Sequence, residues 1–127
     1  MLLNAINHSD RPVPTGFSHA IEVSGAGRML FISGQVAKLA DGTVPAGIVE
    51  QTHVTLAKLN VMLEKAGMSF HNIVKTTIFL TDEADYSDFA SVYFPAMPSP
   101  PPAATGVVVK ALVDPAYLLE IEAIAVA

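Results

Sequence analysis

The 127-residue sequence contains no cysteine, which excludes disulfide bonds, thiolate metal ligands and a cysteine nucleophile. It also contains no run of 18 or more apolar residues, so no segment is predicted to span a membrane. The N-terminus has no basic start followed by an apolar stretch, and a signal peptide is therefore not expected. With neither a signal peptide nor a membrane span predicted, the cytoplasm is the default expectation, while the absence of cysteine does not fix the compartment.

Positive charge is scarce and dispersed. Seven Lys and Arg stand against twelve Asp and Glu, which gives a formal net charge of −5. No two of the basic residues are neighbours in the sequence. Nucleic-acid-binding proteins normally carry a clustered basic surface, so a nucleic-acid partner is not expected.

The length is typical of one domain, which we expect to cover residues 1–127. Hydrophobic residues make up 51% of the chain and charged residues only 15%. One interpretation is a core rich in alanine and valine. The other, which we favour, is that part of the surface is buried between identical subunits, because homomeric interfaces are more apolar than ordinary surface.

Hydrophobic patterns predict the elements of the first half. Residues 19–24 and 29–33 read as two strands of a β-hairpin. Between residues 46 and 66, apolar side chains recur at steps of three and four, which predicts a long helix. Gly67 is a typical helix stop, and the β-branched stretch 73–81 is typical of a central strand.

A second helix is predicted from an N-cap at Asp85 through Phe94. Five prolines between residues 95 and 102 then favour a stiff, extended connection, or alternatively a proline-rich ligand for another protein. Residues 105–112 and 117–126 read as two final strands. This order predicts an α+β two-layer sandwich, in which both helices pack on one face of a mixed sheet.

Three segments resemble the RidA/YjgF family of reactive-intermediate deaminases. They are residues 31–35, which contain Ser-Gly-Gln, residues 72–79, and residues 120–125, which contain Glu-Ile-Glu. The resemblance runs from about Pro14 to the C-terminus. It implies a homotrimer with a barrel-like centre, small-molecule pockets between subunits, and hydrolysis of enamines or imines. Some family members have been described as ribonucleases, which the charge pattern here does not support.

Imine hydrolysis requires a water held against the C=N carbon and a group that takes its proton. A carboxylate can do both. The resemblance assigns this role to Glu120. Glu120 and Glu122 project from the same face of the last predicted strand, and from the residues alone both could be solvated charges at a sheet edge.

The resemblance also indicates a binding pocket. The Ser33 hydroxyl would hold a substrate oxygen or the leaving amine, and Gly34 would let a ligand approach the backbone. The backbone N–H groups of Thr105 and Gly106 would bind an oxyanion. The complete set of expected binding positions is Phe17, His19, Ser33, Gly34, Ala90, Ala104, Thr105 and Gly106.

Three of these positions depart from the family's deaminases. Ala104 replaces the arginine that holds the carboxylate of a 2-imino acid, Phe17 replaces a tyrosine, and Ala90 replaces an asparagine. Each change makes the pocket more apolar, unless Lys110 supplies a substitute charge. We expect either a hydrolase for an enamine, imine or related intermediate without a carboxylate clamp, or a catalytically silent ligand-binding or regulatory trimer.

Of the four histidines, His19 has the best claim to a functional role, although a structural or exposed histidine is the alternative. No histidine pair has metal-ligand spacing beside a carboxylate, so no metal is expected. The resemblance implies no cofactor.

Overall fold

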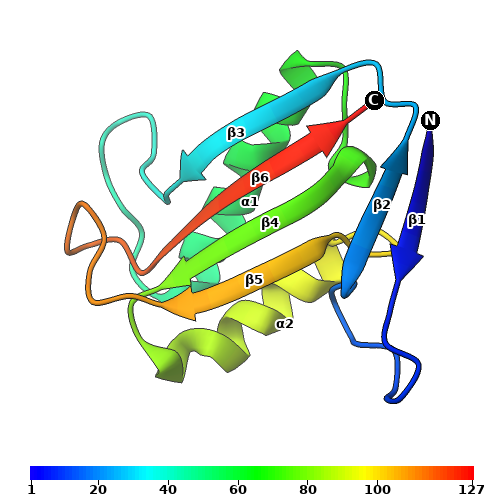
Figure 1. Ribbon diagram of the computed structural model, residues 1–127. Helices are drawn as coiled ribbons and strands as arrows, with labels where there is room; N and C mark the ends of the chain where they lie inside the picture. The colour runs from blue at the N-terminus through cyan, green and yellow to red at the C-terminus, as the bar shows by residue number, and fades with distance from the viewer.

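The computed structural model describes all of residues 1–127. Two helices cover one face of a four-stranded sheet, and a two-stranded sheet stands beside it (Figure 1). The elements are β1 (Leu2–Ile6), β2 (Ala20–Ser24), β3 (Met29–Gln35), α1 (Ile48–Lys65), η1 (Phe70–Asn72), β4 (Ile73–Leu80), η2 (Glu83–Asp85), α2 (Tyr86–Ala96), β5 (Ala103–Val108) and β6 (Leu119–Val126). The predicted α+β architecture is confirmed. None of the helices has the length and hydrophobicity that a membrane span needs.

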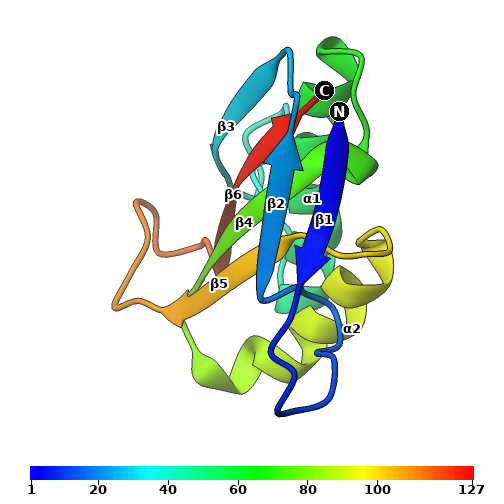
Figure 2. The same cartoon turned by 45° about the vertical axis from the view of Figure 1, so that its right-hand side comes forward.

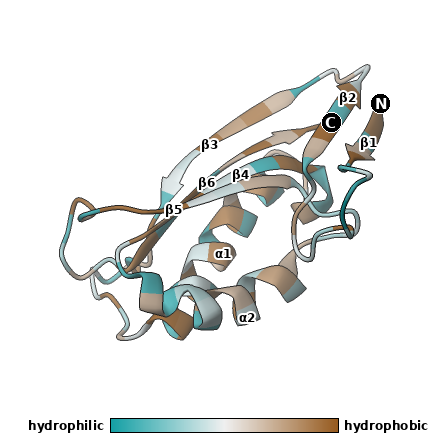
Figure 3. Ribbon diagram, turned by 60° about the horizontal axis from the view of Figure 1, so that its bottom comes forward, coloured by the Kyte–Doolittle hydropathy of each residue, from teal (hydrophilic) through white to brown (hydrophobic).

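The four-stranded sheet has the order β3-β6-β4-β5. Strand β6 is antiparallel to both of its neighbours, whereas β4 and β5 are parallel, so the sheet is mixed as predicted. A parallel pair requires a crossover connection, and α2 provides it. Figure 3 shows α1 and α2 under the same face of the sheet, leaving the other face open.

The long helix α1 follows the predicted stripe. Ile48, Leu56, Leu59 and Leu63 are buried against the sheet. The helix ends where Gly67 takes a left-handed backbone with a φ of 69°, and the N–H of Gly67 donates to the Glu64 carbonyl. A glycine at this position is a common helix terminator because it has no Cβ to clash.

The predicted hairpin between residues 19–24 and 29–33 is wrong. Strand β2 pairs with β1, which the sequence pattern did not reveal, and β3 pairs with β6. The cause lies in the connection, where the N–H groups of Gly27 and Arg28 both donate to the Ala127 carbonyl at 2.9 Å. This contact directs the chain onto the end of β6, and β1 and β2 form a separate ribbon (Figure 2).

Strand β5 begins at Ala103 and ends at Val108, whereas residues 105–112 were predicted. The end is set by its partner β4, which finishes at Leu80. The N–H of Val109 donates to the Leu80 carbonyl at 2.8 Å, and beyond it no neighbouring strand continues.

Helix α2 begins at the predicted N-cap, Asp85, but ends two residues beyond the predicted Phe94. It includes Pro95 and continues to Ala96, because a proline in the last turn removes only one N–H from the helix. Asp85 occupies the N-cap position, but its side chain makes no capping hydrogen bond. The Asp82 carboxylate instead accepts a bond from the N–H of Ala84 at 2.9 Å, at the start of η2.

Candidate functional site

A cavity of about 380 Å³ lies between α2 and the strands β4 and β5. This volume is within the range of about 300–1,000 Å³ that small-molecule sites occupy. Ten of its 13 lining residues are hydrophobic, which makes it an apolar site. The lining comprises Glu83, Tyr86, Phe89, Tyr93 and Phe94 from η2 and α2, Ile78 and Leu80 from β4, Ala104, Gly106, Val107 and Val108 from β5, and Gly16 and Phe17 from the loop before β2.

The first part of strand β5 presents alternate residues to the cavity, and at its end both Val107 and Val108 line it. Ala104 and Gly106 line it, and Thr105 between them faces the opposite side, where its hydroxyl accepts a hydrogen bond from Lys75 Nζ at 2.7 Å. A Cβ added at Gly106 would meet no atom within 4 Å. The wall of β5 therefore leaves open space where longer side chains would project.

Gly16 fits tightly against Phe94 on the other wall. Its φ is 83°, and a Cβ at this position would lie 2.5 Å from the Phe94 ring. The missing side chain lets the loop before β2 approach α2. This contact places Phe17 at the cavity.

We expect Gly16→Ala to destabilise the protein more than Gly42→Ala, which is its matched control. Both glycines have a positive φ, but a Cβ at Gly42 would meet nothing within 4 Å. A left-handed backbone alone costs a residue with a Cβ about 1–2 kcal/mol. The clash with Phe94 should add roughly 1–3 kcal/mol at Gly16 only. Urea unfolding at one protein concentration measures the difference, and equal losses would show that the Phe94 contact yields without cost.

One lining residue, Tyr93, carries a hydroxyl that is hydrogen-bonded within the protein. The Tyr93 hydroxyl and the buried Thr76 hydroxyl lie 2.6 Å apart in a hydrogen bond. Burial raises the pKa of Tyr93 to about 12, so the phenol keeps its proton at neutral pH. Tyr93 is thus a neutral hydrogen-bonding group stacked on Phe89, with ring centroids 5.1 Å apart.

The cavity carries no positive charge. Glu83 is its one charged lining residue, and no lysine or arginine is part of the lining. Lys110 is exposed in the loop after β5 and does not line the cavity. Within one chain it therefore does not take the place of an arginine at Ala104.

Glu120 lies elsewhere, on β6, and its position depends on Gly34. Ile32 pairs with Ala123 and Gln35 with Ile121, so β3 has one extra residue between these pairs, in a β-bulge. A Cβ at Gly34 would lie 2.6 Å from Cδ and 2.8 Å from Cγ of Glu120. The glycine thus leaves the space in which the Glu120 side chain rests.

Glu120 and the cavity lie on opposite sides of the sheet. Glu120 pairs with Phe79 of β4, whereas Ile78 and Leu80 on either side of Phe79 line the cavity. Successive side chains of a strand point to opposite faces. The half-buried Glu120 therefore projects from the open face, and one chain does not bring it to the residues around Ala104.

Of the other predicted binding positions, some line the cavity and others lie elsewhere. Ser33 is exposed on the edge strand β3, in a second hollow between β3 and α1. Ala90 is half-buried on α2 and packs against the core, but it does not line the cavity. Phe17, Ala104 and Gly106 are the predicted positions that the structure gathers around the cavity.

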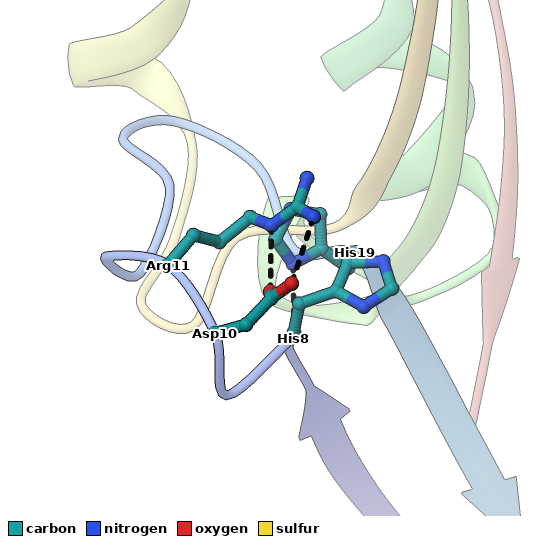
Figure 4. Close-up of polar contacts among 4 residues, drawn as sticks. All are labelled: His8, Asp10, Arg11 and His19. Atoms are coloured by element: carbon teal, nitrogen blue, oxygen red, sulfur yellow. Dashed lines mark hydrogen bonds and ion pairs between the residues drawn. The ribbon is translucent and has the colours of Figure 1, made fainter.

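His19 supports the loop that carries Phe17. Its Nδ1 accepts a hydrogen bond from the backbone N–H of His8 at 3.1 Å (Figure 4). Its ring also lies edge-on to the Phe17 ring, with the ring centroids 5.7 Å apart. In the same loop Arg11 and Asp10 form an exposed ion pair, and the hydrogen bond from Arg11 lowers the pKa of Asp10. His19 is outside the cavity lining.

The chain is similar to known proteins over nearly its whole length. A family model described as Endoribonuclease L-PSP matches residues 8–127. The 2-iminobutanoate/2-iminopropanoate deaminase of Mus musculus is 34% identical over 129 residues, which cover 99% of this chain and 93% of the mouse protein. The chain belongs to the RidA/YjgF family.

Other members of the RidA/YjgF family extend the comparison. Protein DfrA of Myxococcus xanthus is 36% identical over 130 residues and covers 99% of this chain and 97% of its own. The crystal structure of a Rid family protein from Yersinia pestis superposes with a TM-score of 0.84 and 34% identity, over 100% of both chains.

The cavity of this RidA/YjgF chain includes residues that sequence reasoning did not single out. Tyr86, Phe89 and Tyr93 follow one another at steps of three and four along α2. This spacing marks one helical face and was available in the sequence. It does not distinguish a cavity wall from ordinary core packing, whereas the structure does.

Proposed function

We propose that this RidA/YjgF protein hydrolyses a small enamine, imine or related intermediate in a pocket completed by two subunits of a homotrimer. The observation that carries the proposal is the position of Glu120. The carboxylate of the Glu-Ile-Glu motif rests over Gly34 on the open face of the sheet, in a family that includes the mouse 2-iminobutanoate/2-iminopropanoate deaminase.

The chemistry that we propose needs one carboxylate and one water. Glu120 accepts a proton as the water oxygen bonds to the carbon of the C=N group. The proton then passes to nitrogen and gives a neutral carbinolamine. Glu120 next takes the proton of the new hydroxyl and delivers it to nitrogen as the C–N bond breaks, so that ammonia or an amine leaves and a carbonyl compound remains. General base catalysis of this kind typically contributes about 10²–10⁴-fold in rate.

The need for a second subunit follows from the geometry within one chain. The cavity at Ala104 opens on the helix side of the sheet, and Glu120 projects from the other side. A pocket that uses both must combine the Glu120 of one subunit with the cavity of another. A threefold ring does this because each subunit presents two different surfaces to its neighbours.

The alternative proposal is a ligand-binding or regulatory trimer that uses the same pocket without turnover. The apolar positions Phe17 and Ala104 in the cavity lining favour it, since they lack groups that would bind an anionic substrate. A direct experiment distinguishes the two proposals. Imines are generated in solution by an amine or amino-acid oxidase, and ammonia release is followed with and without the protein. Release no faster than spontaneous hydrolysis across such a panel would favour the binder.

Trimer assembly predicts a mass in solution of about three chains of 13.4 kDa. Large exposed side chains on the open face, Met29 and Phe31 among them, would be covered in such an assembly. Sedimentation equilibrium at micromolar concentration measures this mass. A monomer would contradict the proposed pocket, because Glu120 and the cavity would then stay on opposite sides of the sheet.

A further inference from the structure

The cavity between α2 and β5 combines aromatic rings with a single carboxylate. Phe17, Tyr86, Phe89, Tyr93 and Phe94 supply the rings. The face of an aromatic ring carries partial negative charge and attracts cations. Glu83 adds a full negative charge, and neither a lysine nor an arginine lines the cavity to balance it.

We infer that this cavity takes a positively charged ligand with an apolar body, such as a protonated amine or iminium ion. The inference rests on the proposed function and specifies the substrate class of the same site. An iminium ion also suits hydrolysis, because its carbon is more electrophilic than that of a neutral imine. Aromatic rings would hold the apolar body while Glu83 faces the charge.

The surroundings of Glu83 add to this negative potential. Asp82, Asp85 and Asp88 lie within six positions of one another at the start of α2, and no salt bridge neutralises any of them or Glu83. Burial, together with the charges of Asp82 and Asp88, raises the pKa of Asp85. Several carboxylates close together make the nearby cavity favourable for a cation and unfavourable for an anion.

The test compares three probes of similar shape and different charge, which are benzylamine, benzyl alcohol and benzoate. Binding to the full-length protein is measured by calorimetry at neutral pH, where the amine is protonated. We expect benzylamine to bind about 5–30-fold more tightly than benzyl alcohol, and benzoate to bind most weakly. Equal affinity for the alcohol, tighter binding of benzoate, or no binding of any probe at millimolar concentration would overturn the inference.

Variants of the lining residues test whether the preference for benzylamine arises in this cavity. Glu83→Gln should reduce the preference for benzylamine over benzyl alcohol by about 2–5-fold, whereas Glu50→Gln, an exposed carboxylate on α1 outside the lining, should not change it. Ala104→Arg should reverse the order in favour of benzoate. Gly106→Leu has room to project into the cavity and should block all three probes. A preference that survives both Glu83→Gln and Gly106→Leu would place the probe outside this cavity and overturn the inference.

These experiments test the preference for a cation separately from the proposed function. If benzoate is preferred but an imine is still hydrolysed at a rate that depends on Glu120, the function stands and the substrate class is wrong. If benzylamine is preferred but no imine is hydrolysed, the cavity binds cations and the protein is a binder.

Discussion

Glu120→Gln should reduce the rate of imine hydrolysis by roughly 10²–10⁴-fold while ligand affinity changes little. Glutamine has nearly the same shape as glutamate and still forms hydrogen bonds, but its amide is a poor proton acceptor, so only the acid–base step is lost. The measurement pairs single-turnover decay of the substrate with calorimetric binding, for the wild type and the variant. Unchanged turnover would remove Glu120 from the mechanism.

Glu122→Gln is the matched control for this change. Glu122 lies two residues further along β6, on the same face, and it is exposed where Glu120 is half-buried. A general loss of negative charge on the open face would affect both variants alike. We expect turnover to fall in Glu120→Gln only.

Gly34→Ala tests the position of the carboxylate and leaves its chemistry intact. The added Cβ would overlap the Glu120 side chain, so the carboxylate must move although its charge and basicity are retained. A small displacement of a catalytic group can cost about 10²-fold in rate. If Gly34→Ala kept full turnover with Glu120→Gln inactive, the carboxylate would act from a position other than the one over Gly34.

The two-layer architecture was predictable from the sequence because it depends on local patterns of hydrophobic residues and helix ends. The stripe on α1 and the glycine at its end follow from helix periodicity and backbone sterics. The pairing of β2 was not predictable in this way, since its partner Leu2–Ile6 reads Leu-Leu-Asn-Ala-Ile and lacks the apolar/polar alternation of a half-buried strand. Nor was the role of Gln51 predictable, which is buried on α1 and joins the loop before α1 to the loop before β6. Its amide donates to the Pro45 and Ala116 carbonyls, and its oxygen accepts from the Leu118 N–H.

In the candidate site, too, local motifs were predictable from the sequence, whereas contacts that depend on strand pairing were not. Glu120 was predicted from a motif, but its contact with Gly34 depends on a bulge that only the register of β3 and β6 reveals. Gly34 was predicted as a place where a ligand approaches the backbone, and in the structure that space holds the glutamate side chain. Ala104 and Thr105 are neighbours in sequence yet face opposite sides of the sheet, because a strand alternates. A motif match alone does not show which of the two residues faces the cavity.

We expect this protein to hydrolyse 2-iminobutanoate and 2-iminopropanoate about two to four orders of magnitude more slowly than the mouse deaminase to which it is 34% identical. An arginine holds a carboxylate through two parallel charge-assisted hydrogen bonds. At about 1.5–3 kcal/mol each, their loss costs roughly 3–6 kcal/mol. With about 1.36 kcal/mol for each tenfold in rate, this gives the expected range.

Ammonia release from imines produced by an amino-acid oxidase, measured beside the mouse deaminase, checks the rate. Ala104→Arg should recover part of the deficit, because Ala104 lines the cavity and the open space beside Gly106 leaves room for a longer side chain. Ala104→Leu is the control for size, since it fills the space without the charge. A wild-type rate within tenfold of the mouse deaminase would mean that another cation binds the carboxylate. In a trimer the candidate would be Lys110, which is exposed beyond the end of β5, and Lys110→Gln should then abolish that activity.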